Sequence, residues 1–226
     1  MGWLSGWVRL VYPPVCRLCE GMAAEWDGYL CAECAAELWR PGERYGQCDV
    51  IPFVSWMGWL GPYDGATRAA VHAMKFGRQR ELARHLGWML ARRMPVHVPR
   101  PDLVVPVPCS EPARRARGFD QAEELALGMG EELGGEVACR LLTRRGGGRT
   151  QRSLPLERRA ANVRGVFGLR SAGAVRSRRV ALVDDVATTG ATLAAAARLL
   201  RGCGALEVSA FVVARTGSWQ ASRRGG

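Results

Sequence analysis

The chain has 226 residues, of which 48% are hydrophobic and 23% are charged, a balance that excludes a chain disordered throughout. Its length predicts one large domain, alone or with a small module. The formal net charge of +11 favours anionic partners such as phosphate compounds, nucleic acid or an acidic membrane surface, although Lys75 is the only lysine and a general preference for arginine would give the same charge.

Residues 1–14 have the spacing of an amphipathic helix, which we expect to pack on the protein; a helix on a membrane surface is the alternative. No apolar run reaches the ~20 residues that a bilayer-crossing helix needs. The same segment lacks the basic start and the small-residue cleavage site of a signal peptide. The sequence therefore predicts a cytoplasmic protein.

Four of the eight cysteines form two close pairs. Cys16/Cys19 and Cys31/Cys34 each enclose two residues, and 11 residues separate the pairs. Two such knuckles are typical of a tetrahedral, all-thiolate zinc site with no open position, so the zinc would be structural. Four buried free cysteines are the alternative. Such a module can also serve as a docking surface for nucleic acid or protein, and Cys48 has no partner knuckle.

From residue 50 onward, short apolar runs alternate with helical patterns. This alternation predicts an α/β protein with a parallel sheet and helices on both faces. We expect an N-terminal helix and zinc module over 1–48, the α/β domain over 49–216 and a disordered tail over 217–226. Strands are predicted over 50–60, 102–108, 137–142, 180–183 and 206–214, and helices over 66–93 (two, broken near Gly77), 119–133 and 192–201, with a basic loop and a short helix over 146–164.

The strongest functional pattern begins at the apolar run 180–183. Asp184 and Asp185 follow it, then a loop through Thr192, and then a helix. Ligands of open parallel sheets bind beyond the carboxyl ends of the strands. A helix N-terminus preceded by glycine suits a phosphate, and two carboxylates can accept hydrogen bonds from sugar hydroxyls. The loop that would bind the phosphate and ribose comprises Ala187, Thr188, Thr189, Gly190, Ala191 and Thr192.

The alternative is that the two acids merely end a strand and cap a helix. No G-x-x-x-x-G-K-[ST] and no G-x-G-x-x-G pattern is present, so a Walker loop and a dinucleotide fingerprint are excluded. The pattern over 180–193 resembles the phosphoribosyl-pyrophosphate signature of the type I phosphoribosyltransferases. The wider chain resembles the ComF family (ComFC- and GntX-like proteins) through the cysteine pairs, Val105–Pro108, Arg117–Ala122, Gln151 with Leu154, and Arg159 with Asn162 and Phe167.

The resemblance implies the type I phosphoribosyltransferase fold and a site for phosphoribosyl pyrophosphate with Mg²⁺. It implies that the two acids bind ribose hydroxyls and that the loop 187–192 binds the 5-phosphate. The pyrophosphate would lie near the loop after an early strand, and a mobile hood would close over a second substrate. The implied residues are Pro108, Cys109, Ser110, Arg114, Arg115, Arg117 and Lys75 for the pyrophosphate, and Gln151, Arg159 and Asn162 for the hood.

The sequence predicts a binding site but identifies no catalytic base. The purine-salvage members of the superfamily have an acidic base where this chain has Thr188, and no other residue declares itself as a general base. A Mg²⁺-dependent phosphoribosyl transfer to an unspecified acceptor is one hypothesis. ComF proteins are linked to natural transformation, so a binding protein that acts with single-stranded DNA and DNA-uptake proteins is the second. A zinc-stabilised docking module with a vestigial phosphoribosyl site is the third.

Overall fold

The computed structural model describes residues 15–24, 28–40, 44–77, 79–96, 98–144 and 165–217. The expected N-terminal helix over 1–14, the hood residues Gln151, Arg159 and Asn162, and the tail from 218 onward lie outside these ranges. The expected domain limits remain predictions.

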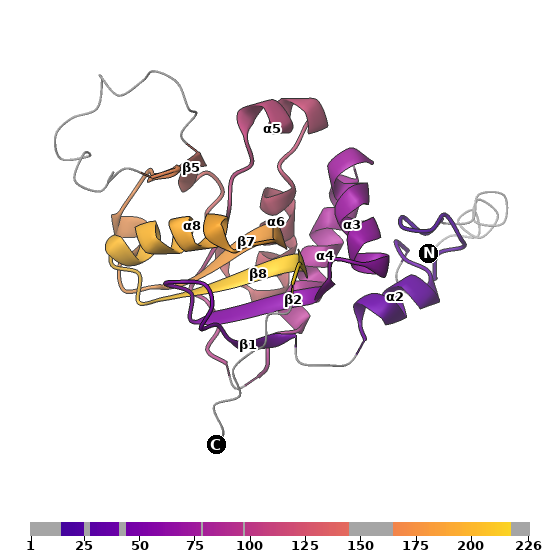
Figure 1. The fold of residues 1–226 in the computed structure, drawn as a ribbon, viewed down its shortest axis with the longest axis horizontal. Coiled ribbons are helices and arrows are strands. Elements are labelled where there is room, and N and C mark those ends of the chain that lie inside the picture. Colours follow the sequence, from indigo (N-terminus) through magenta and orange to yellow (C-terminus); the bar gives the residue numbers. More distant parts are fainter. Residues whose placement is uncertain are drawn as a thin grey trace.

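A six-stranded mixed sheet forms the centre of the molecule (Figure 1). The strands lie in the order β1-β2-β8-β7-β3-β4, and all neighbours are parallel except β1 and β2. The sheet confirms the predicted α/β class, with one antiparallel edge strand. The strands are β1 (Tyr45–Gln47), β2 (Trp56–Pro62), β3 (Leu103–Pro106), β4 (Glu136–Val137), β7 (Arg179–Ala187) and β8 (Glu207–Arg215).

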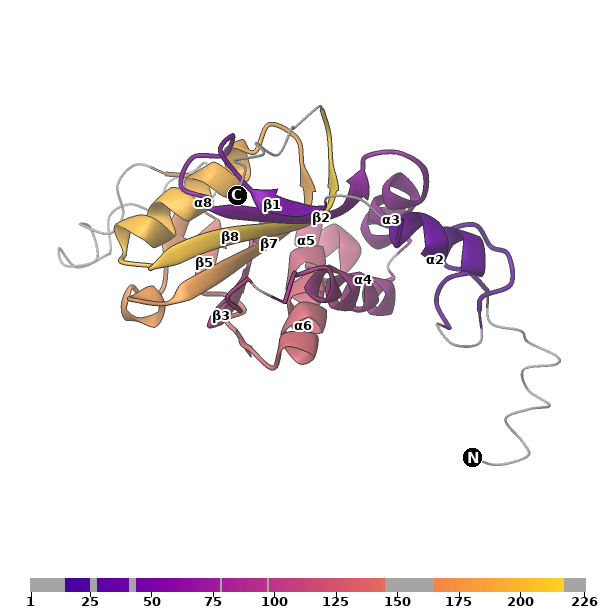
Figure 2. The same ribbon diagram turned by 90° about the horizontal axis from the view of Figure 1, so that it is seen from below.

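Helices cover both faces of the sheet (Figure 2). Alternate residues of the inner strands point to opposite faces, so Ala181 and Val183 pack with one group of helices, while Val180 and Leu182 pack against the other face. The first group is α3 (Gly65–Phe76), α4 (Arg80–Arg92) and α6 (Gln121–Leu133), and α8 (Ala191–Gly202) covers the second face.

Several predicted elements have the expected place. The two helices on either side of Gly77 are confirmed as α3 and α4, and α6, α8 and β8 match the predicted segments to within two residues at each end. β7 is longer than predicted, because it continues through Asp184 and Asp185 to Ala187. The apolar segment 50–60 enters the sheet only at Trp56.

One predicted strand is wrong. Residues 137–142 do not form a continuous strand: β4 ends at Val137, and the chain turns before β5 (Leu142–Arg144). β5 pairs antiparallel with β6 (Phe167–Leu169) in a separate ribbon. The apolar run is divided because Val137 belongs to the edge of the main sheet, whereas Leu142 packs with Phe167 in the second core.

The cysteine segment packs against the sheet domain through α2 (Ala32–Leu38). Both views place α2 at the end of the molecule opposite the β5–β6 ribbon (Figures 1 and 2). Glu37 of α2 accepts a hydrogen bond from the backbone N–H of Ala66, at the start of α3, with an N···O distance of 2.9 Å. In the described ranges, no helix is both long and apolar enough to cross a membrane.

Candidate functional site

Asp184 and Asp185 lie near the carboxyl end of β7, where side chains from two helices reach them. The Nζ of Lys75, from α3, is 3.0 Å from Oδ2 of Asp185. The amide of Gln121, at the start of α6, donates to the same oxygen over 3.3 Å. Oδ1 of Asp184 accepts from the backbone N–H of Asp185 over 2.8 Å. The fold therefore gathers an acid pair, a cation and an amide from three elements that are far apart in sequence.

Both acids are only partly exposed. Burial, and then the neighbouring charge of Asp185, raise the pKa of Asp184 well above its usual value, and the Lys75 ammonium opposes this only in part. A carboxyl group in this state can donate a hydrogen bond when protonated and accept one when ionised. Its neutral form also limits the repulsion between two adjacent carboxylates in the absence of a ligand.

We expect Asp184→Asn to stabilise the ligand-free protein relative to wild type, by more at pH 8 than at pH 4.5. An unfolded aspartate ionises near pH ~3.9, whereas folded Asp184 keeps its proton to a higher pH. Between these two values the wild type loses stability as the pH rises, by up to about 1.4 kcal/mol per pH unit, and the variant does not. Urea unfolding at the two pH values measures the difference.

Asp102 provides the opposite control. The backbone N–H of Arg179 donates to its carboxylate over 2.8 Å, and this hydrogen bond, with the Arg179 charge, lowers the pKa of Asp102. Its favourable contribution is present above the unfolded pKa and is lost as the pH falls. Asp102→Asn should therefore destabilise the protein at pH 8. If the difference in unfolding free energy between Asp184→Asn and wild type is the same at both pH values, the pKa of Asp184 is not raised in the folded protein.

The loop after β7 leads into a helix whose N-terminus is open to solvent. Gly190 has a φ of 73°, a left-handed conformation that glycine adopts without strain, and it precedes α8. Thr188, Thr189 and Thr192 are exposed, and Oγ1 of Thr189 accepts from the N–H of Ala191 over 3.4 Å. Backbone N–H groups at the start of a 12-residue helix, with hydroxyls beside them, suit a phosphate group.

The loop after β3 lies beside the acid pair, because β3 and β7 are neighbours and Pro106 is in register with Val183. Asp120 fixes this loop. Its Oδ2 accepts from the N–H of Cys109 over 2.9 Å, and its Oδ1 accepts from the N–H of Ala122 over 3.0 Å, which caps α6. Burial and the Asp120 charge raise the pKa of Cys109 to about 12, so this thiol is a poor nucleophile at neutral pH.

Sequence reasoning missed Asp120 and Gln121 as residues of this site. Their position at the start of the predicted helix 119–133 was visible, but the loop and the acid that they contact are distant in sequence. The fold also places the residues predicted to bind pyrophosphate in different surroundings. Lys75 contacts the acid pair, and Arg115 of α5 (Glu111–Arg117) pairs with Glu111 over 3.2 Å. Arg114 lines a cavity together with Cys109 and Asp120 of the loop after β3.

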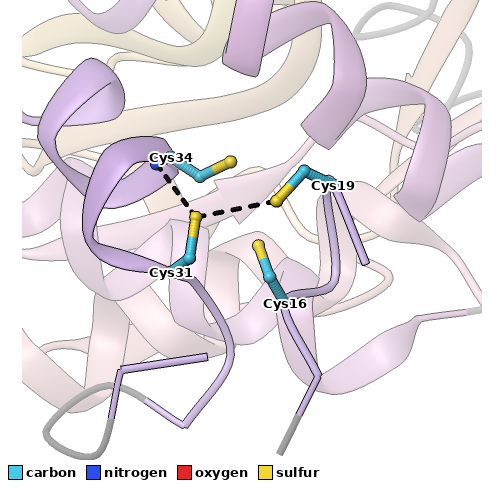
Figure 3. Close-up of side chains that lie close together, drawn as sticks. All are labelled: Cys16, Cys19, Cys31 and Cys34. Carbon is cyan, nitrogen blue, oxygen red and sulfur yellow. Dashed lines mark hydrogen bonds between the residues drawn. The ribbon is translucent and has the colours of Figure 1, made fainter. Parts of the chain in front are cut away.

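The four paired cysteines converge on one point, as Figure 3 shows. The Sγ atoms of Cys16, Cys19, Cys31 and Cys34 all lie within 4.8 Å of one another. The Sγ atoms of Cys19 and Cys31 are 3.6 Å apart, close to the ~3.8 Å expected for two thiolates at tetrahedral zinc. Burial raises the pKa of the Cys16 thiol, but hydrogen bonds from the backbone N–H groups of Cys19, Leu18 and Cys31 have the larger combined effect. The pKa of Cys16 is therefore lowered, to about 7. The donor set fits a thiophilic metal ion such as zinc.

Comparison with known proteins adds two kinds of similarity. The phosphoribosyl transferase domain family matches residues 122–224. The DNA utilization protein YhgH of Salmonella typhi is 30% identical over 209 residues, which are 89% of this chain and 90% of that protein. Competence protein F of Haemophilus influenzae is 31% identical over 207 residues, or 88% of this chain and 90% of that protein.

Among solved structures, the glutamine phosphoribosylpyrophosphate amidotransferase of B. subtilis, complexed with ADP and GMP, is 25% identical with a TM-score of 0.47. The match covers 63% of this chain and 30% of that chain.

Proposed function

The chain belongs to the ComF family of phosphoribosyltransferase-like proteins, and from this premise we propose that it binds phosphoribosyl pyrophosphate with Mg²⁺ and acts in the handling of DNA. The observation that carries the binding proposal is the cluster of Lys75, Gln121 and Asp185 beside the loop 187–192. It provides carboxylates for two ribose hydroxyls and an open helix N-terminus for the 5-phosphate.

Each residue has a role in this proposal. Asp184 and Asp185 accept hydrogen bonds from the ribose hydroxyls, and the backbone of 187–192 donates to the 5-phosphate. The loop Pro108–Ser110, held by Asp120, faces the pyrophosphate, and Arg114 and Arg117 stand near it for charge pairing. Mg²⁺ would be held mainly by the substrate's own oxygens and water, as is usual for this hard ion, and would neutralise the pyrophosphate charge.

In the ligand-free protein, Lys75 shares Oδ2 of Asp185 with Gln121. A ribose hydroxyl that approaches this oxygen meets an ammonium group at hydrogen-bond distance. We propose that Lys75 then turns toward the substrate phosphates, because a lysine side chain is a flexible point charge. This movement would free Oδ2 of Asp185 to accept a hydrogen bond from the ribose hydroxyl.

DNA handling is proposed from the names of the relatives, which describe DNA utilization and competence. Phosphoribosyl transfer is a weaker candidate, because Thr188 stands where the purine-salvage members of the superfamily have an acidic base. A protein that uses phosphoribosyl pyrophosphate as a bound ligand while acting on DNA needs no such base. The exposed threonines of the intact loop favour this function over a vestigial site.

We also propose that Cys16, Cys19, Cys31 and Cys34 hold a structural zinc ion. The ion would bridge the segments 15–24 and 28–40, which otherwise have few core residues. Four thiolate ligands leave no position for substrate or water, so the zinc would take no part in chemistry. We also propose the domain limits 1–48, 49–216 and 217–226, which come from the sequence pattern.

Calorimetry with phosphoribosyl pyrophosphate and Mg²⁺ tests the binding proposal. Asp184→Asn/Asp185→Asn should weaken binding by about 100-fold, because the ribose hydroxyls lose the charged acceptor Asp185 and one of the two carboxyl oxygens of Asp184. Asp102→Asn/Glu136→Gln removes two acidic side chains at the opposite end of the strands and should bind like wild type. The proposal is wrong if folded wild-type protein shows no measurable binding of phosphoribosyl pyrophosphate. It is also wrong if the two double variants bind this ligand with equal affinity.

A further inference from the structure

We propose that Glu37, in the cysteine segment, is a positioning residue for Lys75. The carboxylate of Glu37 caps the amino end of α3, and the last turn of α3 holds the Lys75 ammonium beside Asp185. The effect of Glu37 on the binding of phosphoribosyl pyrophosphate rests on the proposed function. The ion pair of Lys75 with Asp185 exists without the ligand, so it provides a separate test.

Helix α3 takes its cap from another segment of the chain. Asp64 occupies the N-cap position, where an aspartate side chain commonly accepts from a backbone N–H of the first turn, but among the described residues it forms no such hydrogen bond. The N–H of Ala66 donates instead to Oε1 of Glu37, 29 positions earlier, over 2.9 Å. The negative charge of Glu37 also suits the positive end of the helix dipole. The start of α3 therefore depends on α2.

The carboxylate of Glu37 fits closely against the first turn of α3. A Cβ atom at Gly65, the first residue of this helix, would lie 1.9 Å from Oε1 of Glu37 and 3.0 Å from its Cδ. Because glycine has no Cβ, the carboxylate can reach the N–H of Ala66. Both views place α2 beside α3 (Figures 1 and 2). The cap therefore joins two elements that are already packed together.

The cap constrains α3 in a way that the apolar face of the helix does not. This face is buried in the first core through Ala66, Ala70, Val71 and Met74. Burial of apolar side chains is non-directional, so it resists separation of the helix from the sheet more than a slide or a rotation along it. A hydrogen bond is directional. The contact with Glu37 therefore helps to fix the position of α3 along the sheet.

Lys75 lies at the opposite end of the same helix. It is nine residues after Ala66, which corresponds to a rise of about 14 Å along the helix axis. Its Nζ is 3.0 Å from Oδ2 of Asp185, and the two side chains are 26% and 17% exposed. Water screens such a partly buried pair incompletely, so the strength of the pair depends on the distance between its charges. A displacement of the first turn of α3 is carried along the helix to Lys75.

The first test uses the ligand-free protein, in which Lys75 is the only lysine. Labelling lysine with ¹³C and ¹⁵N gives one side-chain NMR signal, and Asp185→Asn supplies the signal of Lys75 without its partner. Glu37→Ala should move the wild-type signal toward that of Asp185→Asn. Glu37→Gln keeps an acceptor oxygen in a side chain of the same length, so it should retain the wild-type signal.

Glu37→Asp is a milder variant, which decides the question if Glu37→Ala does not fold. It keeps the charge but shortens the side chain by one methylene group, so the carboxylate no longer reaches Ala66 and the Lys75 signal should again move. Glu136→Ala is the matched control, because it breaks a glutamate contact of 2.8 Å, with Arg178, at the sheet edge opposite β1. It should leave the Lys75 signal unchanged. Thermal unfolding checks that each variant is folded.

The second test measures the binding of phosphoribosyl pyrophosphate with Mg²⁺ by calorimetry. Glu37→Ala should weaken binding by about fivefold, within the ~2- to 30-fold range that corresponds to the loss of a helix cap. In a Lys75→Ala background the same substitution should change the affinity by less than about twofold, because the group that Glu37 positions is gone. A merely structural role of Glu37 would weaken binding equally in both backgrounds.

The role of Glu37 is overturned if the Lys75 signal is unchanged in Glu37→Ala and Glu37→Asp, or if Glu136→Ala moves this signal as far. Identical signals in wild type and Asp185→Asn, or equal losses of affinity with and without Lys75, would also overturn it. Failure of wild type to bind phosphoribosyl pyrophosphate would count against the proposed function. The lysine signal would still decide whether Glu37 positions Lys75.

Discussion

Cys31→Ser is expected to abolish stable zinc binding and to unfold the segment around α2. The Cys31 side chain is buried, and its Sγ accepts the N–H of Cys34 at the start of α2, so it holds both the metal position and the helix. Structural zinc contributes on the order of 10 kcal/mol to the folding of small cysteine modules, far more than a single hydrogen bond. Elemental analysis should find one zinc per wild-type chain and none in the variant.

Loss of the metal should also loosen α4. The ring of Tyr29 stacks on His85 with centroids 5.0 Å apart, and His85 stacks on Trp88 over 5.4 Å. Trp39, one residue beyond α2, forms a T-shaped pair with Trp88, and Arg93 donates to the carbonyl of Leu38. Hydrogen exchange should therefore accelerate in residues 28–40 and, to a smaller extent, in the part of α4 that carries His85 and Trp88.

Cys203→Ser is the control for this experiment, because Cys203 lies outside the cluster, at the end of α8. It should retain zinc and native exchange rates. Wild-type protein purified with reduced thiols but without zinc would contradict the metal assignment. Zinc-loaded Cys31→Ser with wild-type exchange in residues 28–40 would contradict the role of this cysteine.

Gly128→Ala is expected to destabilise the whole domain by about 2–3 kcal/mol, through overpacking at a helix crossing. A Cβ atom at Gly128 of α6 would lie 1.8 Å from the carbonyl oxygen of Arg84 in α4. At the same crossing, a Cβ atom at Gly87 would lie 2.0 Å from the carbonyl oxygen of Leu125. Both obstacles are backbone atoms, so the two helices would have to move apart.

The midpoint of urea unfolding measures this effect. Gly202→Ala is the matched control, since a Cβ atom at this position, the last residue of α8, meets nothing within 4 Å. It should be neutral or slightly stabilising, by up to about 1 kcal/mol. Equal stability of Gly128→Ala and wild type would show that α4 and α6 separate easily. Because α6 carries Asp120 and Gln121, a shift of this helix should also weaken the phosphoribosyl pyrophosphate site.

The sequence by itself determined the features that depend on residues close together in the chain. The cysteine pairs, the acids before the loop 187–192 and the alternation of strands and helices are local patterns, and each reflects local geometry or the chemistry of one segment. The same patterns were enough to predict the α/β class, which the structure confirms.

Only the tertiary structure decided which distant residues meet. Lys75 reaches Asp185, 110 positions later in the chain, because α3 packs beside the sheet that contains β7. Arg140 and Arg170, 30 positions apart in the chain, line one cavity because β5 and β6 pair antiparallel. The short elements α2, α5 and β5 escaped prediction for the same reason: a few residues have too little local preference to specify a structure, and contacts with the rest of the fold determine it.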